Sequence, residues 1–194
     1  MRIVSLFSLL FVLSFSQAQE SYLYKRTNIK LGHSTKPDYL NSLKRLTLGN
    51  FRLEANQGVS RFVELGAYVG YSRFGNAQYQ EGFDPADNTT WDADYIYSDA
   101  YSYGITANLH LLPFIAKNEE PRFDLYLTAK FGGLSLVAPQ GSVFRGPGID
   151  YGLYGGASFY LSRYWGLFAE FGFNNWIRSR KLESCLRYGI TVKF

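Results

Sequence analysis

The sequence has little of three features, and each shortage excludes a class of protein. It has 194 residues but one cysteine, which excludes an intrachain disulfide framework and a metal site built from several cysteines. No apolar run of about 20 residues follows the N-terminal segment, which excludes a helical membrane protein. The 20 Lys+Arg against 16 Asp+Glu leave a formal net charge of +4, too small and too dispersed to indicate nucleic-acid binding.

The first eighteen residues have the pattern of a cleaved secretory signal. Met1 and Arg2 give a short basic start, and residues 3–15 are mostly Leu, Phe, Val and Ser. Ser16-Gln17-Ala18 then places small residues where a signal peptidase cuts. The apolar run is too short to span a membrane comfortably as an anchor. We therefore expect 1–18 to be a cleaved signal peptide and 19–194 to form one exported domain.

Strict alternation of apolar and polar residues is the dominant pattern after the signal, and it predicts β-strands. Aromatic residues make up 18% of the chain and 19 residues are glycine, which also favours an all-β protein over a disordered one. In the last segment, Leu186, Tyr188, Ile190, Val192 and Phe194 alternate with polar or small residues. Six such segments are clear: 63–72, 101–111, 122–131, 151–161, 165–173 and 186–194.

Two further strands are less regular. Residues 46–57 form a strand only if a one-residue bulge at Gly49-Asn50 restores the phase of Leu46 and Leu48. Residues 22–31 form the eighth strand, which a closed antiparallel barrel with both termini at one end requires. Its outward residues are expected to be Leu23, Thr27, Ile29 and Leu31.

The connections between these strands alternate in length. Short or medium ones are expected near 58–60, 113–120 and 162–164, and long ones at 33–44, 75–98, 138–148 and 174–181. Short turns at one end and long loops at the other are typical of outer-membrane barrels. The sequence therefore predicts an all-β fold, an eight-stranded antiparallel transmembrane β-barrel with short periplasmic turns and long extracellular loops.

Alternation alone does not say which face of the barrel is apolar, so the strand ends and the charges decide it. The apolar set ends in aromatic residues at both edges, as in two membrane-interface girdles: Tyr71, Tyr101, Tyr103 and Tyr151 toward the long loops, and Phe159, Trp165 and Phe194 toward the short turns. The polar set carries charges in mid-strand, which would then face inward. This predicted lumen charge cluster comprises Arg52, Glu54, Glu64, Asp124, Lys130, Glu170, Arg187 and Lys193.

An eight-stranded barrel leaves an interior that side chains fill, and unpaired buried charges are costly. We therefore predict a filled lumen without an open pore. Its centre is expected to hold a contact between Glu170 and Arg187 on neighbouring strands, with Arg52 or Lys130 close by.

The chain resembles the small outer-membrane β-barrels of the OmpA/OmpX type of Gram-negative bacteria. The resemblance covers essentially the whole mature chain and is most specific in the last strand, Leu186, Tyr188, Ile190, Val192 and Phe194. In that family this strand is the signal read by the barrel-insertion machinery. The resemblance therefore implies insertion by that machinery and localisation in the bacterial outer membrane. No family-specific catalytic motif accompanies it.

Three isolated features are candidates for chemistry. His33 and Ser34 are adjacent, so on a strand they point to opposite faces and do not form a base and nucleophile pair. His110 has inward parity and is expected to be a hydrogen-bonded lumen residue rather than a ligand. Cys185 is expected to be a small packed residue rather than an oxidant sensor. The sequence thus predicts no catalytic residue, no metal site and no cofactor.

The long loops carry charges of opposite sign. The loop 75–98 holds Glu81, Asp84, Asp87, Asp92 and Asp94 and no Lys or Arg, which favours a solvated acidic surface over a calcium site because the spacing fits no defined calcium loop. The first and last loops are neighbours in a closed barrel. Their basic residues form either a lipopolysaccharide-contact patch or a solvated rim: Lys36, Lys44, Arg45, Arg178, Arg180 and Lys181.

The sequence favours a non-enzymatic outer-membrane protein that serves envelope structure or surface interaction through its extracellular loops. Its expected partners are outer-membrane lipid and lipopolysaccharide, the barrel-insertion machinery during biogenesis, and an unidentified surface partner, with no nucleic acid. Three alternatives stay open: an outer-membrane enzyme acting on lipid, lipopolysaccharide or peptide, a small-solute pore, and a soluble periplasmic ligand-binding barrel.

Overall fold

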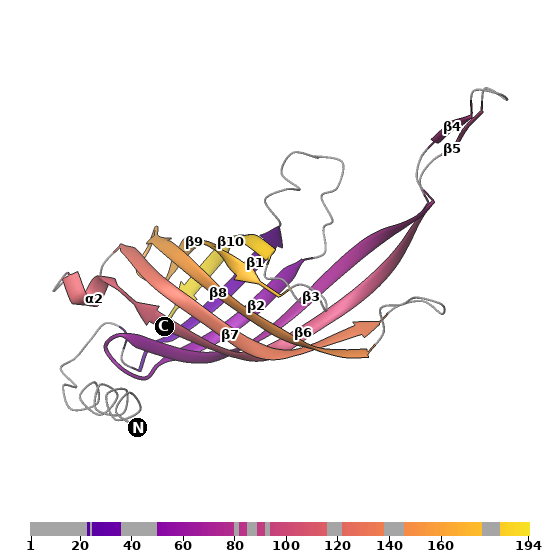
Figure 1. The fold of residues 1–194 in the computed structure, drawn as a ribbon. Coiled ribbons are helices and arrows are strands. Elements are labelled where there is room, and N and C mark those ends of the chain that lie inside the picture. Colours follow the sequence, from indigo (N-terminus) through magenta and orange to yellow (C-terminus); the bar gives the residue numbers. More distant parts are fainter. Residues whose placement is uncertain are drawn as a thin grey trace.

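The computed structural model describes residues 23, 25–35, 50–79, 82–84, 89–91, 94–115, 122–137, 146–175 and 183–194. Eight strands close into one antiparallel barrel in the order β1-β10-β9-β8-β7-β6-β3-β2 (Figure 1). They are β1 (Thr27–Thr35), β2 (Phe51–Gly58), β3 (Val63–Tyr79), β6 (Asp94–His110), β7 (Phe123–Val137), β8 (Gly146–Tyr160), β9 (Trp165–Asn174) and β10 (Glu183–Lys193). The predicted eight-stranded all-β barrel is confirmed.

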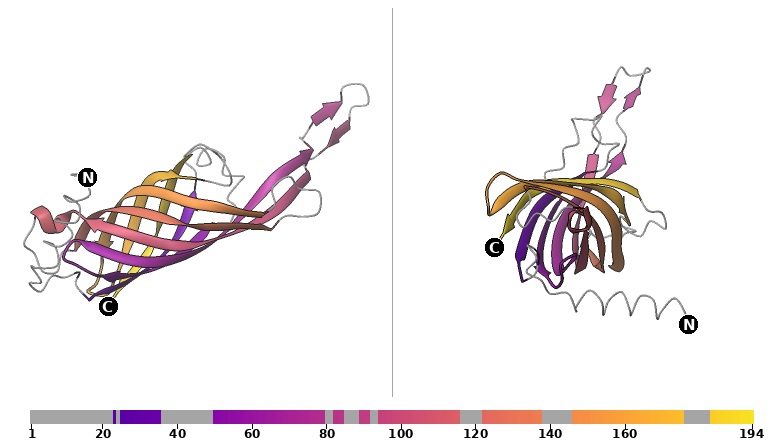
Figure 2. Two further views of the ribbon diagram at one scale, coloured as in Figure 1. Left: turned by 60° about the horizontal axis from the view of Figure 1, so that its bottom comes forward. Right: turned by 90° about the vertical axis from the view of Figure 1, so that its left-hand side faces the viewer.

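Among the described residues, three short elements lie outside the barrel wall. The strands β4 (Gly82–Asp84) and β5 (Thr89–Trp91) form a two-stranded sheet beyond β3 and β6. The helix α2 (Leu112–Ile115) follows β6 at the opposite end, where the C-terminus also lies (Figure 1). Within the described residues, no helix is long and apolar enough to cross a membrane. The views in Figure 2 show the long β3–β6 hairpin projecting from the barrel on the side away from α2.

Side-chain exposure alternates along each strand, and the apolar side chains point outward. In β2 and β9, exposed and buried residues alternate without interruption. The exposed set includes Ile105, Leu125, Leu127, Leu153, Phe171 and Ile190. Among the described residues, the buried hydrophobic cluster is only Ala100, Leu134 and Leu136. The distribution of apolar and polar side chains is therefore the reverse of that in a soluble domain, and the apolar exterior is suited to hydrocarbon.

The first strand differs from the prediction at both ends. It begins at Thr27 and continues to Thr35, whereas the sequence predicted 22–31. Lys25 has a φ of 62°, a left-handed conformation that turns the chain, and the N–H of Arg26 bonds back to the carbonyl of Leu23. Leu23, expected to face outward, is instead buried. The turn therefore prevents the strand from starting before Thr27.

Several predicted loops are shorter than expected because the strands continue into them. β3 runs to Tyr79 and β6 begins at Asp94, so both ends of the predicted loop 75–98 are paired strand. β7 reaches Val137 and β8 begins at Gly146. The backbone ladder continues here without alternation in the sequence, since a strand that leaves the hydrocarbon has no face that must be apolar. Residues 46–49, where the bulge was predicted, lie outside the described residues.

Two short turns are closed by serine. The hydroxyl of Ser60 accepts bonds from the N–H groups of Phe62 and Val63 between β2 and β3. The hydroxyl of Ser162 accepts bonds from Tyr164 and Trp165 between β8 and β9. Such local bonds occupy backbone groups that the ladder leaves free at a tight turn. They account for the brevity of these two connections.

An arginine placed on the outer face should test the orientation of the barrel. Leu127 lies on β7 midway between Phe123 and Phe131, which pair with the girdle residues Phe159 and Tyr151, and it is 44% exposed. We expect Leu127→Arg to lower the free energy of unfolding in lipid bilayers by about 2–4 kcal/mol, because a charge at the midplane loses its hydration. Denaturant titration of the refolded protein measures this. Ser135→Arg, near the outer end of β7, should cost about 1 kcal/mol or less. Equally small losses at both sites would place Leu127 in water.

Candidate functional site

The interior of the barrel holds the charged residues that the sequence places inward. All eight predicted lumen residues are buried, namely Arg52, Glu54, Glu64, Asp124, Lys130, Glu170, Arg187 and Lys193. Lys30 and Asp150 are buried with them, so the buried charged side chains among the described residues are five basic and five acidic besides His110. The buried opposite charges therefore balance.

Sequence reasoning missed Lys30 and Asp150, although the alternation contained the signal for both. Lys30 stands between Ile29 and Leu31, which were assigned outward, so its own side chain had to point inward. Asp150 has inward parity but precedes the predicted start of its strand at residue 151. Extending the strand by one residue would have included it.

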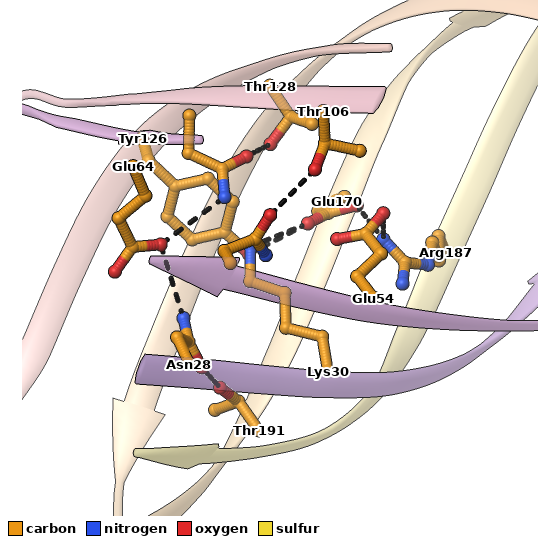
Figure 3. Close-up of polar contacts among 12 residues, drawn as sticks. Asn28, Lys30, Glu54, Glu64, Thr106, Tyr126, Thr128, Glu170, Arg187 and Thr191 are labelled. Atoms are coloured by element: carbon orange, nitrogen blue, oxygen red, sulfur yellow. Dashed lines mark hydrogen bonds and ion pairs between the residues drawn. The ribbon is translucent and has the colours of Figure 1, made fainter. Parts of the chain in front are cut away.

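Glu170 is the centre of the lumen network. Arg187 Nη1 donates to Glu170 Oε2 at 2.8 Å, and Lys30 Nζ donates to Oε1 at 3.1 Å (Figure 3). The predicted contact between Glu170 and Arg187 is thus present, and the two residues are directly opposite on β9 and β10. Arg52 Nη2 lies 3.5 Å from Glu170 Oε2, and the hydroxyl of Tyr126 donates to Oε1 at 3.0 Å. Both carboxylate oxygens are therefore bonded.

Glu54 completes this central group. Its Oε1 lies 2.8 Å from Arg187 Nη1 and 2.7 Å from Arg52 Nη2. Each arginine therefore bridges the carboxylates of Glu54 and Glu170. A carboxylate buried without such partners would cost several kcal/mol, so the group is stable only as a set.

Aromatic rings and two glycines shape the space around these charges. Lys30 Nζ lies 3.7 Å from the centroid of the Tyr126 ring, and the Arg187 guanidinium lies 4.9 Å from that of Phe168. A Cβ at Gly32 would lie 2.6 Å from Phe168 Cζ. A Cβ at Gly156 would lie 2.5 Å from Tyr126 Cε2. Glycine at these two positions therefore makes room for the rings that surround the charges.

A second ion pair lies apart from the central group. Lys130 Nζ is 2.8 Å from both carboxylate oxygens of Asp150. The hydroxyl of Tyr68 donates to Asp150 Oδ2 at 2.7 Å. Arg52 connects the two groups through cation–π contacts, with its guanidinium 5.7 Å from the Tyr68 centroid and 5.1 Å from that of Tyr154.

A third group surrounds Glu64 toward the short-turn end of the barrel. The amide nitrogens of Asn28 and Asn108 donate to Glu64 Oε2 at 3.5 and 3.3 Å. Thr191 donates to the amide oxygen of Asn28, and Thr128 donates to that of Asn108 (Figure 3). These bonds fix which way each amide faces, so the carboxylate meets donors on two sides.

The two histidines have different surroundings. His110 faces two carboxylates, with Nδ1 2.7 Å from Asp124 Oδ2 and Nε2 3.3 Å from Glu64 Oε2. His110 is thus the buried, hydrogen-bonded lumen residue that the sequence predicted. His33 packs edge-on against the rings of Phe51 and Tyr188 on the outer face.

The remaining predicted residues fall into three sets. Lys193 is buried with its Nζ 3.9 Å from the Tyr160 centroid, and Cys185 is a buried free thiol. In the last strand, Tyr188, Ile190 and Phe194 are exposed on the outer face, and Leu186 and Val192 are half-buried. The predicted lipopolysaccharide-contact patch lies outside the described residues: Lys36, Lys44, Arg45, Arg178, Arg180 and Lys181. So do Glu81, Asp87 and Asp92 of the acidic loop.

Solved structures of three outer-membrane proteins are similar to this chain. The N-terminal β-barrel domain of OprF from Pseudomonas aeruginosa matches with a TM-score of 0.56 and 12% identity, covering 88% of this chain and 98% of that one. OprG from the same organism matches at 0.52 and 6% identity, covering 90% and 98%. Ail from Yersinia pestis, in a phospholipid bilayer nanodisc, matches at 0.51 and 14% identity, covering 88% and 99%.

The chain has the fold of the small outer-membrane β-barrels. At these identities the similarity establishes the fold, and the likeness runs almost end to end in each of the three structures. No protein-family model and no curated protein matches the sequence. The predicted resemblance to this barrel type therefore holds at the level of architecture.

Removal of one partner from the central group should destabilise the barrel strongly. We expect Arg187→Leu to lower the free energy of unfolding by about 3–5 kcal/mol, because Glu54 and Glu170 both lose a buried cation. Denaturant titration of the refolded protein measures the loss. Arg73→Leu is the matched control, since Arg73 is half exposed and its Nε is 3.5 Å from Asp99 Oδ1. That control should cost about 1 kcal/mol or less, and a similar cost at both sites would contradict the expected role of Arg187.

Proposed function

We propose that this protein is an integral outer-membrane β-barrel with a filled lumen, which acts without enzymatic activity as an envelope and surface-interaction protein. The observation that carries the proposal is the inverted distribution of side chains, with large apolar residues outside and balanced, paired charges inside. Such a surface is stable in hydrocarbon, and such an interior is stable only when enclosed. Outer-membrane lipid, lipopolysaccharide and the barrel-insertion machinery are its proposed partners.

The lumen supports a structural role over a transport role. The central group reaches across the interior, because the Arg52 guanidinium on β2 lies 5.1 Å from the Tyr154 centroid on β8, the strand opposite β2 in the barrel, while Lys30 on β1 contacts Glu170 on β9. Arg52 and Arg187 add contacts from β2 and β10 to the same carboxylate. An ion passing through would have to break several of these contacts at once. The filled lumen therefore favours a plugged barrel.

The histidines also support a non-enzymatic role. The chain has two, and both ring nitrogens of His110 face carboxylates rather than a nucleophile. His33 points outward between aromatic rings, whereas Ser34 belongs to the opposite face and lines the lumen. A histidine and serine relay of the kind used in acyl transfer needs the two within hydrogen-bond reach.

The projecting hairpin supports a surface role. Pairing of β3 with β2 ends at Tyr71, and pairing of β6 with β7 begins at Asp99. Beyond these points, and among the residues that the structure describes, 72–79 pair only with 94–100, so each arm of the hairpin has one backbone edge that no other described strand covers. An open strand edge binds an extended segment of a partner by adding a strand. The loop sequence 75–98 carries only acidic charges, which favours a basic partner segment.

Electrical recording should separate the plugged barrel from a pore. Protein reconstituted in planar lipid bilayers is expected to give no steady ion current, because the central contacts occupy the lumen. A channel-forming porin added under the same conditions shows that the assay detects openings. Steady unitary openings from the purified chain would overturn the filled-lumen proposal.

Epitope labelling of intact bacteria should test which end faces outward. An epitope replacing residues 80–93 should be labelled on intact cells, because the projecting hairpin is proposed to be extracellular. The same epitope placed at Ser162–Tyr164 should be labelled only after the outer membrane is permeabilised. Heat-modifiable gel mobility establishes that both variants fold. The reverse labelling pattern would refute the proposed topology.

A further inference from the structure

The short-turn end of the barrel carries basic residues in each of its three connections and before the first strand. Arg61 lies between β2 and β3, Arg163 lies between β8 and β9, and Arg122 directly precedes β7. Lys25 lies in the turn before β1. Arg61 is half-buried and the other three are exposed. Among the described residues, this end exposes no acidic side chain, so the C-terminal carboxylate is the one anionic group beside these cations.

The sequence of this end stays basic when its undescribed residues are counted. The N-terminal segment 19–26 and the connections 59–62, 111–122 and 161–164 together hold six Lys or Arg residues and three Glu. At the opposite end, the loop 75–98 holds five acidic residues and no Lys or Arg. The two ends of the barrel therefore differ in charge, and the short-turn end attracts anions.

Two aromatic rings and a cation form one group on the β2–β3 turn and α2. Phe114 of α2 is 62% exposed, although its ring stacks on that of Phe62 with 4.2 Å between the centroids. The Arg61 guanidinium lies 5.6 Å from the Phe62 centroid, and its Nη2 donates to the carbonyl of Pro113 at 3.4 Å. These contacts hold a guanidinium beside an exposed apolar ring.

The same combination of rings and cations continues along the edge of the apolar outer face. Phe123, Phe159 and Trp165 are exposed at the ends of their strands. Arg122 directly precedes Phe123, and Arg163 comes two residues before Trp165. A soluble acidic partner would leave these rings in water. A lipid with an anionic headgroup covers the rings with its apolar part and meets the cations with its phosphate.

We propose that the short-turn end of the barrel binds phospholipids whose headgroups carry a net negative charge. This inference rests on the proposed function, which places the short turns at the periplasmic leaflet, and it names the lipid that this end selects. Arg61 and Arg163 contact the headgroup, because the N–H groups of a guanidinium match phosphate oxygens. The ring of Phe114 lies at the boundary between headgroups and acyl chains, where aromatic rings are stable.

Native mass spectrometry of the folded full-length barrel tests the inference, with equal amounts of phosphatidylglycerol and phosphatidylethanolamine that carry the same acyl chains. We expect phosphatidylglycerol adducts to exceed phosphatidylethanolamine adducts about 5-fold, the factor expected of one basic side chain near an anionic lipid. Arg163→Gln should lower this ratio to about 2 by removing one of the contacts. Arg61→Gln combined with Arg163→Gln should bring it to about 1.

Arg73→Gln is the matched control, because Arg73 is half exposed but lies on β3 toward the projecting hairpin. It removes the same charge and should leave the lipid ratio of the unmodified chain unchanged. Phe114→Ser should reduce the adducts of both lipids without changing their ratio, because the ring contacts the part that the two lipids share. Heat-modifiable gel mobility establishes that each variant is folded.

Three results overturn the inference: equal adducts of the two lipids on the folded unmodified chain, an equal loss of preference in Arg73→Gln and Arg163→Gln, or a mass of two chains without lipid. The last result would indicate that a second copy of the chain covers this end. Failure of the unmodified chain to form a heat-modifiable barrel would refute the proposed function itself, so the two failures are distinguishable.

Discussion

The contact of Arg187 and Arg52 with Glu54 and Glu170 is the interaction on which the rest of the structure depends. These four side chains come from β10, β2 and β9, so they connect strands that are far apart in the sequence but close across the lumen. The contacts of Glu54 with Arg187 and of Arg52 with Glu170 form only when β1 pairs with β10 and closes the sheet. Closure is in turn required because hydrocarbon offers no hydrogen bonds to an open strand edge. Both the lipid outside and the paired charges inside therefore require a closed sheet.

The lumen is divided into groups with different chemical character. Around Glu170 the partners are cations, whereas around Glu64 they are mostly amides held in place by threonine hydroxyls. Toward the projecting hairpin, the polar side chains are less completely satisfied and a pocket remains. A filled interior of this kind stabilises the barrel and closes the route through it.

The outer-face and lumen assignments could be predicted because the membrane imposes a period of two. Leu125, Phe171 and Tyr188 had to face lipid, so their neighbours Asp124, Glu170 and Arg187 had to face inward. The alternation rule fails beyond the membrane, where lipid no longer requires one face of a strand to be apolar. Residues 72–79 and 94–98 remain paired strand although their sequence does not alternate. The start of β1 was also missed, because the turn at Lys25 depends on a backbone bond to Gly58 that is distant in sequence.

The sequence by itself determined the fold class, the number of strands and which residues of each strand face inward. Lipid outside the barrel and a narrow interior inside it require apolar and polar residues to alternate along each strand. Only the tertiary structure decided which charges meet. Parity places Lys30, Arg52 and Lys130 in the same lumen, yet Lys130 binds Asp150 while the other two contact Glu170. Those partners are set by strand register and by the height of each side chain in the barrel. Both depend on pairing between strands that are remote in the chain.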